Sequence, residues 1–397
     1  MTLSFVGPGS IEVGKGCDAD RSLEDLLYRT ELSSKTPSRL PAKYLGMPAE
    51  EIHDRILTAR KKLGNRLVVL GHHYQRDEII QYADFRGDSF KLAQNAAAHP
   101  EADYLIFCGV HFMAESADIL SAEHQKVILP NLSAGCSMAD MAPTSDVLAC
   151  WDQLQAVGDV AGTITPVTYM NSTAALKAFC GANNGLVCTS SNAKAVVGWA
   201  LGQSEKILFF PDQHLGRNTA IQLGYSPDDT VVWDPFQPLG GNTEEGLRHA
   251  KFILWRGHCS VHKRFTVQQI EDARERFPGI NIIVHPECEM EVVEIADYVG
   301  STEYIIKTVQ EAPSGTQWAV GTEINLVKRL ADEHPDKPTF CLDPVVCPCS
   351  TMYRIHPAYL AWVAEGLAEG DVINQVAVDE TVSHWAKVAL ERMLETT

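Results

Sequence analysis

The chain has 397 residues, enough for two or three domains, and its 45% hydrophobic and 21% charged residues exclude a disordered protein. Its formal net charge of −18 argues against nucleic acid as a partner, because phosphate binding requires clustered Lys and Arg side chains. No apolar run approaches the roughly 20 residues of a membrane helix, and residues 1–16 lack the basic start and apolar core of a signal peptide. We therefore expect a cytoplasmic protein that has no membrane partner.

The N-terminal part of the chain differs from the remainder. Residues 1–48 have little periodicity and several Gly and Pro residues, so we expect a loose arm with one short helix at 21–31. Residues 49–64 place Ile52 and Ile56 at helical spacing, which predicts a helix that leads into the first strand.

Beyond this helix one pattern occurs three times: a short apolar strand, a polar turn and a helix. The three units begin with LVVLGHHYQ (67–75), ITPVTYMNS (164–172) and INIIVHPECEM (280–290). Each unit ends in a strand that is followed closely by a cysteine. Repetition on this scale predicts the architecture of the whole chain.

Strands that alternate with helices form parallel sheets, and ligands bind beyond the carboxyl ends of such strands. We therefore predict an α/β fold of three repeated units, each a three-layer αβα arrangement with a short parallel sheet. The units should be arranged with pseudo-threefold symmetry around a central cavity. The predicted domains follow the arm in the order 49–150, 151–265 and 266–397, the last with a C-terminal helical tail.

The chain has 11 cysteines, and three of them, Cys136, Cys259 and Cys347, follow the last strand of a unit. A helix start lowers the pKa of a thiol and favours the thiolate that a metal requires. Three thiolates suit a [4Fe–4S] cluster with one open iron that acts as a Lewis acid, whereas structural zinc usually has four ligands at shorter spacing. The alternative is that all three are buried, inert thiols. Cys349 also remains a candidate, but we prefer Cys347 because it directly precedes a proline.

The turns after the first two strands of each unit carry polar side chains. Those after the first strand are His72, Tyr74, Tyr169, Asn171, His285 and Glu287. His, Tyr and Glu are general acid–base groups, although a single such residue at a strand end is more often structural. His73 should face away from the cavity, because side chains alternate along a strand.

Hydroxyl side chains occupy the predicted helix starts, at Ser89, Ser190, Ser301 and Thr302. They could cap the helices, bind anions there, or do both. His262 lies one helical turn after Cys259 and should face the same side. His111, Glu115, His214 and Arg217 are weaker candidates.

These motifs resemble those of the quinolinate synthase A family, in the family's order from about residue 67 to 357. The matching segments include GHHYQRDEI, GDSFKLA, TYMNS, CTSSNA, HPEC and VGST. The resemblance implies a triplicated α/β fold around a [4Fe–4S] cluster with three cysteine ligands. It also implies the reaction: iminoaspartate condenses with dihydroxyacetone phosphate to give quinolinate, phosphate and water, in de novo NAD biosynthesis.

The resemblance assigns roles by motif. Cys136, Cys259 and Cys347 would ligate the cluster, and His72, Tyr74, Tyr169 and Glu287 would transfer protons. Asn171, His262 and His285 would position intermediates, and Ser89, Ser190, Ser301 and Thr302 would bind carboxylates and phosphate. The segment 217–248 is longer than in short members of the family and should widen the second unit.

Two other functions fit the three cysteines. A reductase that passes electrons through the cluster would need a ferredoxin partner, and the sequence has no second cluster or flavin motif. An iron–sulfur sensor would need a partner surface, and the negative charge argues against DNA. The expected partners are therefore the two small substrates, with a functional link to an aspartate oxidase that supplies iminoaspartate.

Overall fold

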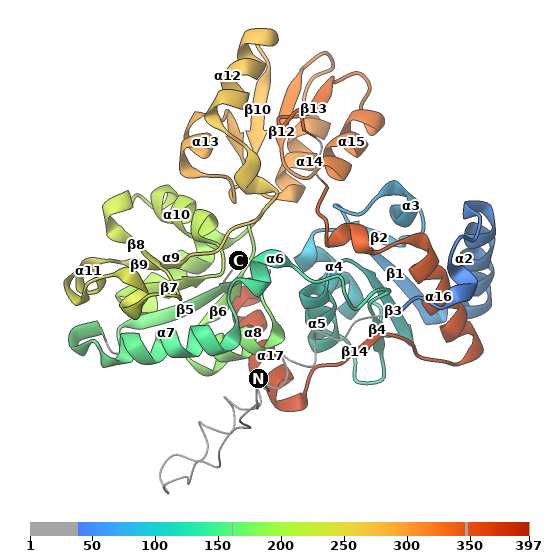
Figure 1. Ribbon diagram of the computed structural model, residues 1–397, viewed down its shortest axis with the longest axis horizontal. Coiled ribbons are helices and arrows are strands. Elements are labelled where there is room, and N and C mark those ends of the chain that lie inside the picture. The colour runs from blue at the N-terminus through green and yellow to red at the C-terminus, as the bar shows by residue number, and fades with distance from the viewer. Residues whose placement is uncertain (1–38, 161, 346–347, 397) are drawn as a thin grey trace, which may run out of the picture.

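The computed structural model describes residues 39–160, 162–345 and 348–396. It forms three lobes around a common centre (Figure 1), and each lobe contains one sheet. The predicted helix at 21–31 and Cys347 lie outside the described residues, and the domain boundaries remain predictions. The predicted α/β class with short parallel sheets is confirmed.

The three sheets share one strand order, in which the unit's first strand lies between its second and its third. The first sheet contains β1 (Leu67–His72), β2 (Phe85–Gly87), β3 (Tyr104–Cys108), β4 (Lys126–Ile128) and β14 (Gln375–Val376). The second contains β5 (Ile164–Tyr169), β6 (Leu186–Cys188), β7 (Lys206–Phe210), β8 (Thr230–Trp233) and β9 (Phe252–Trp255). The third contains β10 (Asn281–Val284), β11 (Tyr298–Val299), β12 (Trp318–Gly321) and β13 (Thr339–Cys341).

All neighbouring strands are parallel except β14 and β4, so the carboxyl ends of each unit's strands meet at one edge. Every residue of β1 and β5 is buried, as in sheets covered by helices on both faces. The long segment 217–248 supplies β8 at the outer edge of the second sheet, which widens the second unit as expected.

Helices connect the strands. In the first two units they are α2 (Ala49–Leu63), α3 (Asp77–Ile80), α4 (Ser89–Ala97), α5 (His111–Leu120), α6 (Ser137–Asp140), α7 (Thr144–Ala156), α8 (Ala174–Ala182), α9 (Ala193–Gln203), α10 (Gln213–Gln222) and α11 (Glu244–His249). The third unit and the tail contain α12 (Val267–Arg276), α13 (Met290–Ile295), α14 (Thr302–Glu311), α15 (Ile324–Glu333), α16 (Pro357–Glu369) and α17 (Glu380–Glu395). The predicted helix at 49–64 is confirmed as α2, which buries Ile52 and Ile56.

The C-terminal tail is helical, as predicted, and its two long helices pack on the first and second units. Helix α16 packs on α2 of the first unit, and α17 packs on α8 of the second (Figure 1). Between them, β14 pairs with β4 and becomes the edge strand of the first sheet. Leu360, Val363 and Leu367 form a buried face of α16. Their apolar spacing indicates such a face but does not indicate which element covers it.

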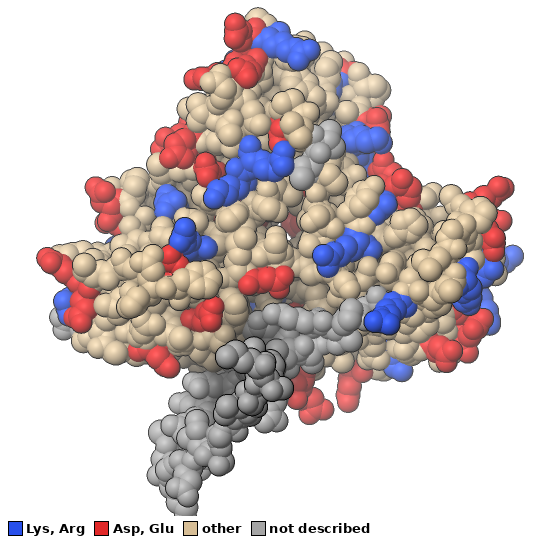
Figure 2. Space-filling model, in the orientation of Figure 1, with Lys and Arg blue, Asp and Glu red and all other residues tan. Residues whose placement is uncertain are grey.

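The surface has acidic and basic side chains interspersed. On the face in Figure 2, several Lys and Arg side chains lie in separate patches near the junction of the lobes and form no continuous stripe. Among the described residues, no helix is both long and apolar enough to cross a membrane.

Candidate functional site

The carboxyl ends of the strands face a central cavity. All three units contribute to its lining. The predicted residues that line it are His72, Tyr74, Ser89, Cys136, Tyr169, Asn171, Ser190, Cys259, His262, His285, Glu287 and Thr302. The repeat pattern therefore brings together side chains that are more than 200 residues apart in the sequence.

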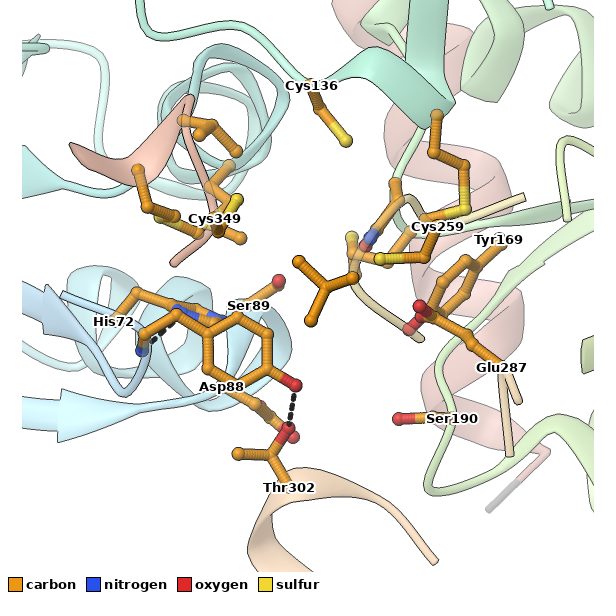
Figure 3. A pocket seen from close by; sticks show the side chains of 18 of the residues that line it. His72, Asp88, Ser89, Cys136, Tyr169, Ser190, Cys259, Glu287, Thr302 and Cys349 are labelled. Atoms are coloured by element: carbon orange, nitrogen blue, oxygen red, sulfur yellow. Dashed lines mark hydrogen bonds between the residues drawn. The ribbon is translucent and has the colours of Figure 1, made fainter. Parts of the chain in front are cut away.

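Three cysteines, one from each repeat, also line the cavity: Cys136, Cys259 and Cys349. Figure 3 shows them on different sides of one open space, with the sulfurs of Cys136 and Cys259 directed into it. The position of Cys347, the residue preferred from the sequence, is not described. Thiolates from separate chain segments around one space are a donor set that fits an iron–sulfur cluster.

The pKa values of the three cavity thiols differ from those expected from the sequence. The backbone N–H groups of Ala139 and Met138 at the start of α6 favour the thiolate of Cys136, but burial outweighs them and raises its pKa to about 12. Burial likewise raises the pKa of Cys259 and Cys349. The prediction of a lowered pKa is therefore wrong for the metal-free protein. An enclosed cavity disfavours the charged form, so metal binding must displace the thiol protons.

Glu287, which follows β10, is a buried acid–base group of the cavity. Its Oε2 lies 2.6 Å from Nδ1 of His262, and both side chains are buried. Burial alone raises the pKa of Glu287, but the charges of His262 and His285 and the hydrogen bonds from His262 and Tyr169 outweigh it and lower the pKa to about 2. Glu287 is therefore a carboxylate at neutral pH. Cys259, His262 and Glu287 also hold their ligand atoms within 4.8 Å of one another, a group that could hold a metal ion.

Thr322 links this group to the first unit, and the sequence analysis assigned it no role. Its hydroxyl is 3.0 Å from Nε2 of His262 and 2.8 Å from the hydroxyl of Tyr74. The ring of His262 also stacks on that of His285, with the centroids 4.3 Å apart. Thr322 directly follows β12, and only the folded chain shows that His262 reaches its hydroxyl.

His72 and His73 face opposite sides of β1, as predicted. His72 lines the cavity, and its Nδ1 accepts the backbone N–H of Tyr74 at 3.1 Å. His73 turns away and lies 2.8 Å from Oε1 of Glu303. Burial, assisted by the nearby His73, lowers the pKa of His72 to about 3, and burial beside His262 lowers that of His285 to about 3. His72 and His285 are therefore neutral at neutral pH.

These neutral histidines predict acid sensitivity of the metal-free protein. In the unfolded chain each has an ordinary pKa of about 6.5, so between about pH 6.5 and 3 the unfolded state binds more protons and stability rises with pH. Lowering the pH from about 7 to about 5 should remove about 2 kcal/mol for each histidine. Thermal unfolding at the two pH values measures this loss. His72→Asn or His285→Asn should make the loss smaller, whereas His249→Asn, at an exposed position, should leave it unchanged.

The hydroxyl residues do not all serve the cavity. Ser89, Ser190 and Thr302 line it. The N-cap of α4 is Asp88, whose carboxylate accepts the N–H groups of residues 90 and 91, so the hydroxyl of Ser89 is not used as a cap. Asp88 itself lines the cavity, and its place at the helix start before Ser89 was a signal that the sequence analysis missed.

Ser301 differs from the other three. It caps α14 by accepting the backbone N–H of Tyr304, and it does not line the cavity. Among the weaker candidates, His111 and Glu115 lie in a separate polar cavity beside Cys136. His214 is buried, and Arg217 lies one turn further along α10. The prediction that Ser301 contacts substrate therefore has no support from the cavity geometry.

Comparison with known proteins agrees with these motifs. A family model described as "Quinolinate synthetase A protein" matches residues 54–395. The chain is 58% identical over 356 residues to a quinolinate synthase of Corynebacterium glutamicum, which covers 89% of this chain and 90% of that one. It is 56% identical over 370 residues to one of Streptomyces coelicolor, with 92% of each chain covered, and 56% identical over 383 residues to one of Nocardioides sp., with 95% and 97% covered. The chain therefore belongs to the quinolinate synthetase A family of enzymes.

Proposed function

We propose that this chain is a quinolinate synthase of de novo NAD biosynthesis, acting in the cytoplasm. It would condense iminoaspartate with dihydroxyacetone phosphate and release one quinolinate, one phosphate and two waters. The observation that carries the proposal is the central cavity, in which cysteines from all three repeats face buried acid–base side chains. The names of the relatives support the same activity.

We propose that Cys136, Cys259 and Cys349 hold a [4Fe–4S] cluster. Cys349 replaces Cys347, the residue preferred from the sequence, because its backbone hydrogen bond matches those of Cys136 and Cys259. The carbonyl oxygen of each of the three accepts the N–H of the residue four positions later, from Asp140, Lys263 and Tyr353 respectively, at 3.0 Å in every case. When bound, such a cluster would supply an open iron that acts as a Lewis acid toward an oxygen of the substrate.

The residues two positions before Cys136 and Cys259 also support the choice of Cys349. The carbonyl of Ala134 accepts the first N–H of α5 at 2.8 Å, and the carbonyl of Gly257 accepts the first N–H of α10 at 3.0 Å. Both residues precede a cavity cysteine by two positions, and Cys347 precedes Cys349 by the same two. By sequence position, Cys347 therefore corresponds to Ala134 and Gly257, and Cys349 corresponds to the cavity cysteines Cys136 and Cys259.

The other side chains would carry the proton transfers that dehydration and ring closure require. Glu287 is ionised and can accept a proton, while the hydroxyl of Tyr169, hydrogen-bonded to it, can donate one. Neutral His72, which lies beside Tyr74, can either donate or accept a proton. The hydroxyls of Ser89, Ser190 and Thr302, with the amide of Asn171, would bind the carboxylates and the phosphate. Ser301 is left out of this set, because it caps α14 and does not line the cavity.

The test is an assay without oxygen, with freshly generated iminoaspartate and dihydroxyacetone phosphate as substrates and quinolinate measured by chromatography. The wild-type protein should contain about four irons per chain and form quinolinate. Cys349→Ser should lose the iron, the visible colour and the product, because an alcohol does not replace a thiolate ligand. Cys347→Ser is the matched control and should keep all three.

Two outcomes would redirect the proposal. A protein that holds its iron but forms no quinolinate would lose the substrate assignment, and a reductase fed by a ferredoxin would become the next candidate. Loss of iron in Cys347→Ser but not in Cys349→Ser would reverse the choice of ligand. Whether an aspartate oxidase supplies iminoaspartate directly can be tested in the same assay, by comparing the oxidase in mixture with chemically generated substrate.

A further inference from the structure

Two buried acidic residues occupy equivalent places in the second and third units. Asp212 is the N-cap of α10, two residues after the end of β7, and Glu323 is the N-cap of α15, two residues after the end of β12. The strands β7 and β12 are the third strands of their sheets in the shared order. Both side chains are fully buried. In the first unit the same place, the N-cap of α5, is occupied by Val110, which has no side-chain oxygen.

The carboxylate of Asp212 connects a helix to a cavity cysteine. Its Oδ1 accepts the backbone N–H of Leu215 at 2.8 Å, which is an ordinary N-cap bond. Its Oδ2 accepts the backbone N–H of Cys259 at 3.2 Å. One side chain thus joins the start of α10 to the backbone of a proposed cluster ligand that lies 47 residues further along the chain.

Glu323 makes the same connection in the third unit. Its Oε2 accepts the backbone N–H groups of Asn325 at 2.8 Å and Leu326 at 3.4 Å, which caps α15. Its Oε1 accepts the backbone N–H of Cys349 at 3.2 Å and the side-chain N–H of Asn325 at 2.9 Å. The two residues differ in length and in sequence context, yet each divides its oxygens between a helix and a cysteine.

This division of oxygens explains why a carboxylate is present. An N-cap requires one acceptor, which Ser, Thr or Asn supplies equally well. Here a second acceptor faces a second N–H group, and a carboxamide has only one oxygen and would place an NH₂ group against that donor. Burying a carboxylate is costly unless its oxygens are hydrogen-bonded, so capping alone does not account for Asp and Glu at these places.

We propose that Asp212 and Glu323 are positioning residues that hold Cys259 and Cys349 by their backbone N–H groups and so keep two sulfurs directed at the cavity. The inference rests on the proposed function, because it takes these cysteines as cluster ligands. Removal of either carboxylate should allow its cysteine loop to move and the cluster to be lost faster, while the helix cap remains.

The experiment compares Asp212→Asn and Glu323→Gln with the wild-type protein after cluster reconstitution without oxygen. The rate of iron release to the chelator ferrozine is followed together with the visible absorbance of the cluster. Each variant should release iron about three- to tenfold faster, the effect of losing one buried hydrogen bond. The melting temperature of the metal-free protein should change little, because the remaining carboxamide oxygen can still cap the helix. Asp379→Asn, at the N-cap of α17 and far from any cavity cysteine, is the control and should release iron at the wild-type rate.

The outcomes separate this inference from the proposed function. A wild-type protein that holds no iron or forms no quinolinate contradicts the function. A wild-type protein that does both, with variants that release iron at its rate, contradicts only the positioning role. The positioning role is also contradicted if the melting temperature of a variant falls in proportion to its faster iron release. The residue would then support the fold in general. If one variant does not fold, the other decides, and failure of both to fold has the same meaning as a general loss of stability.

Discussion

Glu287→Gln is expected to lower kcat by about 10²–10⁴-fold and to leave the iron content unchanged. Gln has nearly the same shape as Glu but cannot accept a proton at neutral pH. The carboxylate is buried, its pKa is about 2, and it lies 2.6 Å from His262 with Tyr169 also bonded to it. No water can readily replace a buried acid–base group of this kind, so the loss should appear in the chemical step.

The measurement is quinolinate formation under single-turnover conditions, together with iron content and the absorbance spectrum of the same samples. Glu303→Gln provides the control, because Glu303 bonds to His73 outside the cavity lining. It should retain the wild-type rate. A Glu287→Gln protein that turns over within about threefold of the wild type would remove Glu287 from the proton-transfer groups, since general acid–base catalysis contributes far more than that.

The second large effect concerns stability, at the contact between α8 and α17. Gly181→Ala should destabilise the protein by about 2 kcal/mol or more, because an added Cβ would lie 2.0 Å from the backbone oxygen of Trp385. Backbone cannot move aside as the end of a flexible side chain can, so the two helices would have to separate. Thermal unfolding of the metal-free protein should show the loss as a lower melting temperature.

Gly198→Ala is the matched control, and it is expected to raise the stability of the protein rather than lower it. Gly198 is an exposed residue within α9, and the nearest heavy atom to its added Cβ would be 4.0 Å away. Ala should therefore stabilise the helix by about 0.5–1 kcal/mol, the usual difference between the two residues. If both substitutions raised the melting temperature, the close packing of α17 on α8 would be wrong.

Much of the fold could be predicted from the sequence because its repeats use the same kinds of residues at the same places. Buried strands such as β1 and β5 are mostly apolar, and the residues that end them, such as His72 and Tyr169, are polar. Parallel sheets place such turns at one edge, so their convergence follows from topology without knowledge of any contact.

Other features depend on contacts that spacing does not encode. The choice between Cys347 and Cys349 depends on which residue lies in register with Cys136 and Cys259, and adjacent candidates in one loop look alike in sequence. Thr322 was overlooked because a hydroxyl gains its role only from the histidine beside it. The pKa of the thiols was predicted from the helix start alone, whereas burial in the finished cavity determines it.

The position of the tail has a consequence for how the chain folds during its synthesis. Domains generally fold in the order in which they leave the ribosome, N-terminal first. Here the first sheet lacks its edge strand β14, and α2 and α8 lack their partners, until residues 357–395 have been made. The first and second units therefore leave the ribosome with apolar faces exposed, and those faces are covered only after all three repeats have been made. A chain that terminates before α16 would contain three complete repeats and still be left without the helices that cover two of them.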